Sequence, residues 1–571
     1  MAIELNRQQD RAVNALGHCS VLACPGSGKT RELSMRAARL LAENKTGRLC
    51  AVTFTRDAAK ELKSRILALC GEREARRLAV GTFHSVALSQ LLKLRKFSKI
   101  KLLSDGERRG LLRRCYSQYK CDTPFDKVLS AIDRDKSKLE RTVFSDPGIE
   151  DVFDAYQKLL VAERGMDFSD ILLETVNGIR DASIKPLAVR WLLADEFQDA
   201  DDVQTQWVIA HGKAGVEITI VGDDDQSLYA FRNALGYAGM LDVSKALAAQ
   251  EITLPINYRC APNILSGAAK LIANNPHRAS KNIVADRTTS GILKAHRAAD
   301  RFDEARLAVD AIKESTGQSW AILARTNSLL EIVESELLLK NVDYRLAGGK
   351  SVWDGVTGSA LVGLLKSVQS DGWTGMANAL SVCGVRSELL NLSVHGQVNC
   401  APMLEKILES VQDSDVRLKK TVSSLLSGFG AWQRQVALGN TTLAVYGASS
   451  WLAQHIKQDR GALITRLANI IAKLRGSIAQ RLNTLSRQSD PGGDGEPGVL
   501  LTTLHSSKGL EFDGVWMLGA EDGNLPHPDS TEDEERRLFY VGMTRARDRL
   551  EISSSIEDGL ASRFMAEAGL F

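Results

Sequence analysis

The sequence predicts an α/β fold with mainly parallel sheets. Apolar runs typical of strands recur along the 571 residues with helix-like segments between them, which is the pattern of parallel sheets flanked by helices. One run leads through a glycine-bearing turn into a helix-like segment, a local order that binds phosphates in α/β proteins. Hydrophobic residues make up 44% of the chain and charged residues 25%, so several cores can form. The clearest strand-like runs are Leu49–Phe54, Trp191–Asp195, Ile218–Val221, Trp320–Ala324, Val499–Thr503 and Val515–Leu518.

The cysteine pattern and the lack of long apolar runs indicate the cellular compartment of the protein. No uninterrupted apolar run approaches the ~18–20 residues that cross a bilayer, and the N-terminus lacks the pattern of a signal peptide. The nine cysteines include no Cys-x-x-Cys pair, which favours reduced thiols over a zinc ribbon or an iron–sulfur cluster. We therefore expect a cytoplasmic protein with no membrane partner. The net charge of +3 permits a nucleic-acid partner without requiring one.

The stretch Ala23–Thr30 has the composition of a phosphate-binding loop. It follows the apolar run Ser20–Ala23 and precedes the helix-like segment Arg31–Glu43. Glycines let the backbone curl so that its N–H groups face a phosphate, and the helix adds its positive N-terminal end. We expect Lys29 to contact the β- and γ-phosphates of a nucleotide and the Thr30 hydroxyl to bind Mg²⁺. The alternative is a glycine-rich turn before a lysine, since Ala23 stands where the usual pattern has its first glycine. The predicted nucleotide-binding residues of this loop are Cys24, Pro25, Gly26, Ser27, Gly28, Lys29 and Thr30.

An acidic pair, Asp195 and Glu196, ends the apolar run that begins at Trp191. Carboxylates at the carboxyl end of a parallel strand lie beside the phosphate loop in doubly wound sheets. Asp195 is therefore the predicted Mg²⁺ ligand, and Glu196 the residue that orients and deprotonates the attacking water. The alternative is a strand that simply ends in a charged turn.

The strand-like run Glu217–Val221 leads into Gly222–Asn233, which reads Gly-Asp-Asp-Asp-Gln-Ser-Leu-Tyr-Ala-Phe-Arg-Asn. With this stretch the chain closely resembles the UvrD/Rep-like superfamily 1 DNA helicases, and the match is ordered and runs nearly end to end. Leu5–Gln9 resembles the adenine-reading Q motif, Val52–Arg56 motif Ia, and Gly81–Ser85 the DNA-contacting motif that follows. Asp195–Asp199 resembles motif II, Gly222–Phe231 motif III and Asn257–Arg259 motif IV. Thr503–Phe512 is similar to motif V, and Glu535–Ala546 to motif VI. One such motif is a modest signal, but the ordered set is a strong one.

The resemblance implies further roles in ATP hydrolysis. Gln9 and Tyr258 would contact the adenine, and Glu511 would accept a hydrogen bond from the ribose. Gln226 would sense the γ-phosphate, whereas Arg259 and Arg545 would neutralise charge on the transferring phosphoryl group. A guanidinium suits phosphate oxygens, although each arginine could instead pair with a surface carboxylate. ATP and Mg²⁺ are the expected cofactors.

The resemblance also implies contacts with single-stranded DNA. Aromatic side chains stack on any base, because every base has a π-face. Phe54 and Phe83 could instead be core residues, since each stands beside a strand. Phe231 stands where many relatives carry tryptophan, and Asn233 replaces a usual glycine. The predicted DNA-binding residues are Phe54, Thr55, Thr82, Phe83, His84, Tyr229, Phe231 and His505.

The expected architecture is two RecA-like P-loop NTPase cores, each with a mainly helical insertion. The first core comprises residues 1–85 and 186–256, with an insertion at 86–185. The second comprises residues 257–354 and 499–571, with a short insertion at 355–498 that ends in the Pro/Gly/Asp-rich linker Ser489–Gly498.

The resulting functional prediction is an ATP-dependent DNA helicase that moves 3′ to 5′ along one strand and unwinds duplex DNA. Its substrates would be single-stranded and tailed duplex DNA. Relatives usually carry an aromatic wedge after motif VI, but Ser553–Gly559 contains no aromatic residue. Two alternatives therefore stay open: a translocase with little unwinding, and a nucleotide-gated DNA clamp. A protein partner from a repair, mobile-element or defence complex could supply what is missing.

Overall fold

A computed structural model describes residues 5–94, 100–229, 233–315, 317–347, 351–390, 399–412, 415–456, 458–488 and 498–570. The chain forms two compact units. The first comprises Met1–Ser290 and Ser530–Thr544, and the second comprises Gly291–Asp529 and Arg545–Phe571. Across the described ranges, no helix combines the length and apolar character that crossing a bilayer requires. The predicted linker falls almost entirely outside these ranges.

The first unit is built on a six-stranded parallel sheet with the strand order β3-β2-β6-β7-β1-β8. Its strands are β1 (Cys19–Ala23), β2 (Leu49–Thr53), β3 (Leu78–Thr82), β6 (Trp191–Ala194), β7 (Glu217–Gly222) and β8 (Gln250–Leu254). Side chains alternate between the faces of a strand, and here both faces are buried. Val21 and Ala23 pack with Leu33 on one face, whereas Leu22 belongs to the core around Trp207 on the other.

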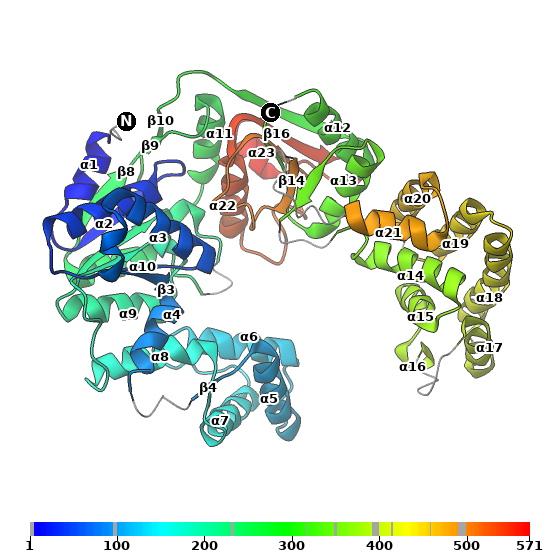
Figure 1. Cartoon of the computed structure of the whole chain (residues 1–571), viewed down its shortest axis with the longest axis horizontal. Coiled ribbons are helices and arrows are strands. Elements are labelled where there is room, and N and C mark those ends of the chain that lie inside the picture. Colours follow the sequence, from blue (N-terminus) through cyan, green and yellow to red (C-terminus); the bar gives the residue numbers. More distant parts are fainter. Residues whose placement is uncertain are drawn as a thin grey trace. The chain divides into compact units, whose positions relative to one another are not determined.

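Helices cover both faces of this sheet (Figure 1). One face carries α1 (Arg7–Asn14), α2 (Lys29–Glu43) and α3 (Arg56–Cys70). The other carries α4 (Phe83–Leu91), α8 (Phe168–Arg180), α9 (Asp202–Lys213) and α10 (Tyr237–Leu247). Within its described residues, this unit also has the 3₁₀ turns η1 (Glu72–Arg76), η3 (Phe197–Asp199) and η4 (Asp224–Gln226).

The segment between β3 and β6 is mainly helical, as predicted. It contains α5 (Asp105–Gln118), α6 (Phe125–Lys136) and α7 (Pro147–Ala162), and the short strands β4 (Lys101–Leu102) and β5 (Gly165–Met166) pair in parallel. Leu112, Ile132, Val152 and Tyr156 form a separate small core for these helices.

Two segments assigned from the sequence to the second core belong to the first compact unit. One carries β9 (Ile256–Asn257), α11 (Pro262–Ile272) and β10 (Val284–Ala285), and the other is α22 (Glu532–Met543). They pack on each other, and Arg536 Nη1 donates to Asn275 Oδ1 at 2.7 Å. This packing brings residues far apart in the sequence next to the sheet of the first unit.

The second unit contains another six-stranded parallel sheet, in the order β11-β16-β15-β12-β14-β13. Its strands are β11 (Ile292–Ala298), β12 (Trp320–Ala324), β13 (Tyr344–Leu346), β14 (Val499–Thr503), β15 (Phe512–Met517) and β16 (Ala546–Ser555). Helices α12 (Arg301–Lys313) and α13 (Asn327–Leu339) pack on it through Val309 and Leu330, and α23 (Arg563–Glu567) follows β16.

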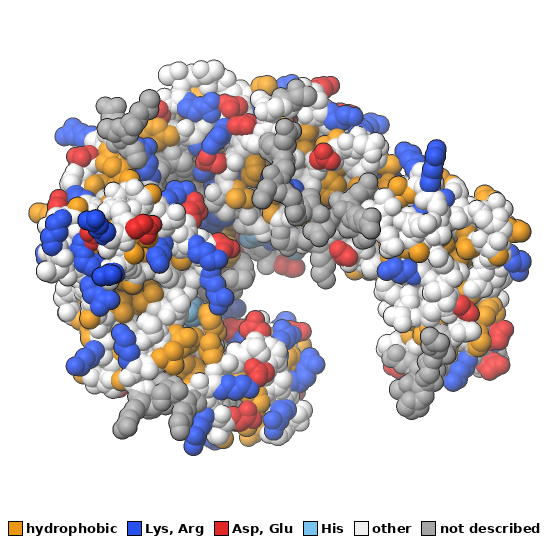
Figure 2. All heavy atoms as spheres, viewed as in Figure 1, with side chains coloured by type: hydrophobic (Ala, Val, Ile, Leu, Met, Phe, Trp, Pro, Cys, Tyr) orange, Lys and Arg blue, Asp and Glu red, His pale blue; other side chains and the backbone are white. Residues whose placement is uncertain are grey.

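A helical insertion with its own large core joins β13 to β14. Its helices are α14 (Val356–Ser370), α15 (Trp373–Val382), α16 (Ser387–Leu390), α17 (Cys400–Ser410), α18 (Val416–Ala437), α19 (Thr441–His455), α20 (Gln458–Lys473) and α21 (Ile478–Gln488). The predicted fold class, two parallel α/β cores with helical insertions, is therefore confirmed. On the face shown in Figure 2, basic and acidic side chains are interspersed, in keeping with the net charge of +3.

Candidate functional site

The turn between β1 and α2 has a backbone that requires glycine at two positions. Gly26 and Gly28 have φ values of +62° and +79°, in the left-handed region that costs other residues strain. A Cβ atom on Gly26 would also lie 2.7 Å from Arg259 Cβ. Gly28 directly precedes α2, whose first N–H groups have no partner within the helix and can bind an anion.

Neighbouring segments hold this loop in shape. Gln9 Nε2 donates to the Ser27 carbonyl at 2.9 Å, Asn257 Nδ2 to the Pro25 carbonyl at 2.7 Å, and the Tyr258 N–H to the Gly26 carbonyl at 3.0 Å. The Ser27 hydroxyl closes the turn by donating to the Cys24 carbonyl at 2.8 Å. The loop therefore has a defined conformation set by protein contacts.

The predicted acidic pair lies beside this loop. Lys29 Nζ is 3.4 Å from Glu196 Oε2, and Thr30 Oγ1 is 3.4 Å from Asp195 Oδ2. Burial and the neighbouring Glu196 raise the pKa of Asp195 to about 6. A hydroxyl and a carboxylate oxygen at this distance form a donor set that suits Mg²⁺, a cation that prefers oxygen ligands.

The backbone of Glu196 is itself unusual. Its φ of +53° is rare for a residue with a side chain, and such strain often occurs at functional sites. Gln198 Nε2 donates to Glu196 Oε2 at 2.6 Å, which orients the carboxylate. The same Gln198 accepts a hydrogen bond from the Asp223 N–H at 2.9 Å, so the ends of β6 and β7 are connected.

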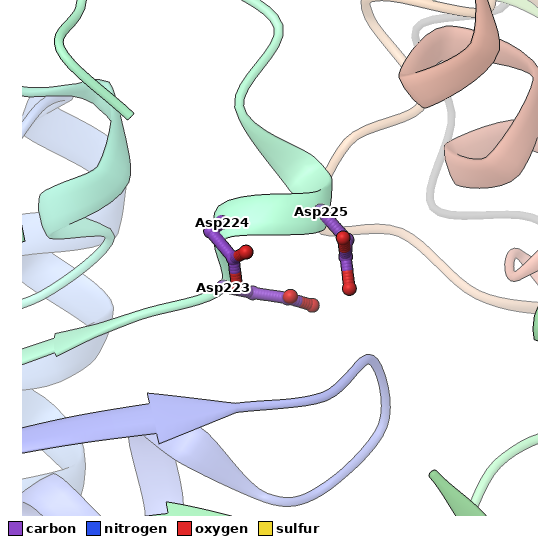
Figure 3. Close-up of side chains that lie close together, drawn as sticks. All are labelled: Asp223, Asp224 and Asp225. Atoms are coloured by element: carbon purple, nitrogen blue, oxygen red, sulfur yellow. The ribbon is translucent and has the colours of Figure 1, made fainter. Parts of the chain in front are cut away.

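Three aspartates follow β7, and their carboxylate oxygens lie within 4.8 Å of one another (Figure 3). Asp223 Oδ2 accepts from Gln226 Nε2 at 2.6 Å. The ammonium of Lys281 contacts all three carboxylates. Sequence reasoning missed Lys281, because it lies 58 residues from Asp223 and belongs to no local spacing pattern.

The predicted adenine-binding residues also meet near the loop. Asn6 Nδ2 donates to the Tyr258 hydroxyl at 2.7 Å, and Tyr258 is 37% exposed. Gln9 is 3% exposed and uses its amide oxygen to accept from the Asn6 N–H at 3.1 Å. The Arg259 guanidinium donates to the Thr544 carbonyl at 3.1 Å.

Three of the predicted site residues belong to the second unit. Arg545 is 1% exposed there and donates to the Leu510 carbonyl at 3.1 Å. Glu511 forms an ion pair with Arg547, and His505 is half-buried after β14. The arrangement within the first unit thus does not include these three residues.

Two of the predicted DNA-binding residues begin helices at neighbouring strand ends. Thr55 caps α3 by accepting from the Ala58 N–H at 3.1 Å, and Thr82 caps α4 by accepting from the Ser85 N–H at 3.2 Å. Strands β2 and β3 run in parallel with Thr53 opposite Thr82, so the two helix N-termini lie at the same edge of the sheet. Helix N-termini favour phosphate groups.

The aromatic residues predicted to contact DNA differ in how deeply they are buried. Phe83 is 1% exposed and packs against Trp207, which supports the alternative that it is a core residue. Phe54 is half-buried, with its ring centroid 5.2 Å from that of Phe83. Tyr229 is half-buried as well, and Phe231 lies outside the described residues.

Phe168, which sequence reasoning missed, presents an exposed ring that stacks on the half-buried ring of the predicted His84. The two rings stack with centroids 4.2 Å apart and an interplanar angle of 23°, and Phe168 is 51% exposed. Nothing in the sequence signals this exposure. Helical spacing places Phe168, the first residue of α8, on the same stripe as Ile171, Leu172 and Val176, so periodicity alone would predict a core position for it.

Comparisons with known proteins match nearly the whole chain. Residues 5–238 match the profile of the UvrD/REP helicase N-terminal domain, and residues 252–355 and 448–557 match that of the UvrD-like helicase C-terminal domain. DNA helicase II of Haemophilus influenzae is 29% identical, in an alignment that covers 98% of this chain and 86% of that protein. ATP-dependent DNA helicase Rep of Escherichia coli is 29% identical, with 96% and 90% covered. ATP-dependent DNA helicase PcrA of Leuconostoc citreum is 26% identical, with 98% and 83% covered.

Proposed function

Because this chain belongs to the UvrD/Rep helicase family, we propose that it is an ATP-dependent DNA helicase that moves 3′ to 5′ on single-stranded DNA. The observation that carries the proposal is the placement of Lys29 and Thr30 opposite Glu196 and Asp195. A phosphate loop and an acidic pair at one edge of a parallel sheet are the parts that phosphoryl transfer to water requires.

Each residue proposed for hydrolysis has its own role; all of them lie in the first unit except Arg545, which belongs to the second. Lys29 and the N–H groups at the start of α2 bind phosphate oxygens of ATP. Thr30 and Asp195 hold Mg²⁺, which when bound neutralises charge on the phosphates. Glu196, oriented by Gln198, accepts a proton from the attacking water. Gln226 senses the γ-phosphate, while Arg259 and Arg545 stabilise the charge that spreads over the phosphoryl group.

The first unit also offers a surface for one DNA strand. The N-termini of α3 and α4 lie at one edge of the sheet and would bind backbone phosphates. The exposed ring of Phe168, which stacks on His84 close to the start of α4, would hold a base. This combination binds single strands without reading their sequence, as a motor that moves along DNA requires.

One observation favours a second function, a translocase with little intrinsic unwinding. In the second unit β16 ends at Ser555, and the turn that follows joins it to α23, which begins at Arg563. The exposed hydrophobic side chains there are the aliphatic Ile556 and Leu560. An aliphatic turn offers less surface than an aromatic tip for stacking against the end of a duplex.

The experiment that tests the proposal measures ATP hydrolysis with and without single-stranded DNA, and unwinding of duplexes with 3′ or 5′ tails. DNA should stimulate hydrolysis, and only the 3′-tailed duplex should be opened. Glu196→Gln should bind ATP normally and hydrolyse it about 10²–10⁴-fold more slowly, the usual contribution of a general base. Glu409→Gln, at an exposed site on α17, serves as the control. A Glu196→Gln protein that hydrolyses ATP at the wild-type rate would refute the assigned base.

A further inference from the structure

The acidic loop after β7 encloses one cation completely. The side chain of Lys281 is 0% exposed, and its Nζ lies 2.7 Å from Asp223, 2.6 Å from Asp224 and 2.9 Å from Asp225. Burial alone would lower the pKa of this lysine, but the three carboxylates outweigh it and hold the pKa well above its ordinary value. Burying four charges is costly, and only close pairing offsets that cost.

Each aspartate of this cluster has a different second partner. Asp223 accepts from the Gln226 amide at 2.6 Å, and Asp224 accepts from the Ala279 N–H at 2.7 Å. Asp225 receives two hydrogen bonds of 2.8 Å from Arg278. Asp223 is thus the carboxylate that contacts both Lys281 and Gln226.

Lys281 also contacts the strand that leads into the phosphate loop. Its Nζ lies 3.3 Å from the Ala23 carbonyl, at the last residue of β1. One ammonium therefore connects the end of β1 with the end of β7. These are the two strands that carry the phosphate loop and the predicted γ-phosphate sensor.

We propose that Lys281 is a positioning residue for ATP hydrolysis, which acts by fixing Asp223 and through it the amide of Gln226. The positive charge of Lys281 offsets the repulsion between Asp223 and the two neighbouring carboxylates. Asp223 therefore keeps its position, and its Oδ2 atom continues to accept the hydrogen bond from the Gln226 amide. The proposal rests on the proposed function, because it needs Gln226 to act on the γ-phosphate. It differs from a metal site, since the ammonium already occupies the centre of the three carboxylates.

The matched control lies in the same cluster. Arg278 contacts Asp225, so Arg278→Met removes a partly buried charge of the same cluster without touching the contact to Gln226. Lys281→Met should lower kcat for DNA-stimulated ATP hydrolysis about 10–100-fold, as loss of a supporting partner of a reactive group commonly does. KM for ATP should change little. Arg278→Met should keep kcat close to wild type.

Loss of a buried cation can also prevent folding, so a second variant separates charge balance from position. Lys281→Met combined with Asp224→Asn returns the cluster to its original net charge but leaves Asp223 without its ammonium. This protein should regain thermal stability relative to Lys281→Met and keep the low kcat. A kcat restored together with stability would show that Lys281 acts only by balancing charge, and would overturn the proposal.

A double-mutant cycle with Gln226→Ala gives the decisive readout. If Lys281 acts through Gln226, then Lys281→Met should lower kcat no further in the Gln226→Ala background. Fully multiplicative losses would overturn the proposal. Wild-type protein without DNA-stimulated hydrolysis, or Gln226→Ala with wild-type kcat, would instead refute the proposed function on which it rests.

Discussion

The ring of Phe168 is half exposed and lies flat against the ring of His84, whereas Phe83 is buried next to Trp207. All three residues, Phe168, His84 and Phe83, belong to α4 or α8. Their different exposure decides which of them can contact a base. An exposed ring can stack on DNA at little cost, but a core ring can do so only by leaving the core.

Phe168→Ala should therefore weaken binding of a single-stranded oligonucleotide by about 1–3 kcal/mol, the usual contribution of one stacked base. The unfolding temperature should hardly change, because half of the side chain is already exposed. Fluorescence anisotropy with labelled oligo-dT at constant salt measures the affinity. Tyr446→Ala, on the exposed surface of α19, is the control. An unaltered affinity would remove Phe168 from the DNA site.

Phe83→Ala should show the opposite pattern. Truncating a buried phenylalanine costs about 3–5 kcal/mol of stability, which urea unfolding would detect. Oligo-dT affinity of the fraction that remains folded should stay close to wild type. Weaker binding without loss of stability would return Phe83 to the DNA-contacting residues.

At the scale of elements, α4 and α9 are joined by a buried polar cluster. His211 Nδ1 lies 2.7 Å from the Trp207 carbonyl, and its Nε2 lies 3.2 Å from Gln90 Nε2. Trp207 Nε1 in turn donates to Gln90 Oε1 at 3.1 Å. This pattern fits a neutral imidazole that donates from Nδ1 and accepts at Nε2. A second ring proton would face the NH₂ group of Gln90 with no acceptor.

Burial lowers the pKa of His211 to about 4, below the value of about 6.5 in an unfolded chain. The unfolded state therefore binds the proton more tightly. The contribution of neutral His211 to the free energy of unfolding is therefore complete above about pH 6.5 and is lost as the pH falls towards 4. At pH 5 the loss is about 2 kcal/mol. His84, whose pKa burial also lowers to about 4, should act in the same direction.

We accordingly expect His211→Gln to reduce the loss of unfolding free energy between pH 7.5 and pH 5 by about 2 kcal/mol. Urea unfolding at the two pH values measures this loss. The quantity to compare between the variant and the wild type is the difference in unfolding free energy between pH 7.5 and pH 5. His277→Gln, at an exposed position, should retain the wild-type pH dependence. The same dependence in His211→Gln as in wild type would show that His211 is not the group responsible.

For the whole molecule, the question is how an ATP-driven motor separates two strands. A rigid wedge at the fork blocks re-pairing after each step, but the turn between β16 and α23 carries Ile556 and Leu560 in place of an aromatic tip. One step of DNA stacking is worth about 1.4 kcal/mol on average. Without a wedge, unwinding should depend on spontaneous opening of the duplex.

The proposal therefore predicts faster unwinding of A·T-rich than of G·C-rich duplex, with translocation on single strands much less affected. Strand separation on 3′-tailed duplexes of equal length, at saturating ATP and without partners, measures the ratio. Translocation on unpaired DNA of matched composition is the control. Equal unwinding rates would mean that another part of the chain supplies the wedge.

The sequence by itself determined the strands, the phosphate loop and the acidic pair. The run Trp320–Ala324 became β12 and Val499–Thr503 became β14 with the predicted bounds. Local chemistry decides such elements. Apolar runs form buried strands, glycines supply positive φ values, and the carboxyl ends of parallel strands meet at one edge of a sheet. Lys29, Thr30, Asp195 and Glu196 could thus be placed together before the fold was known.

Only the tertiary structure decided which side chains from distant segments meet. It buried Phe83 and left Phe168 exposed, although both are phenylalanines at the first position of a helix. It also placed Lys281 among three aspartates that precede it by more than fifty residues, and Asn257 against the carbonyl of Pro25. Such contacts depend on how helices and loops pack on the sheet. Local propensity and spacing carry no information on that packing, because the residues involved are neighbours in space alone.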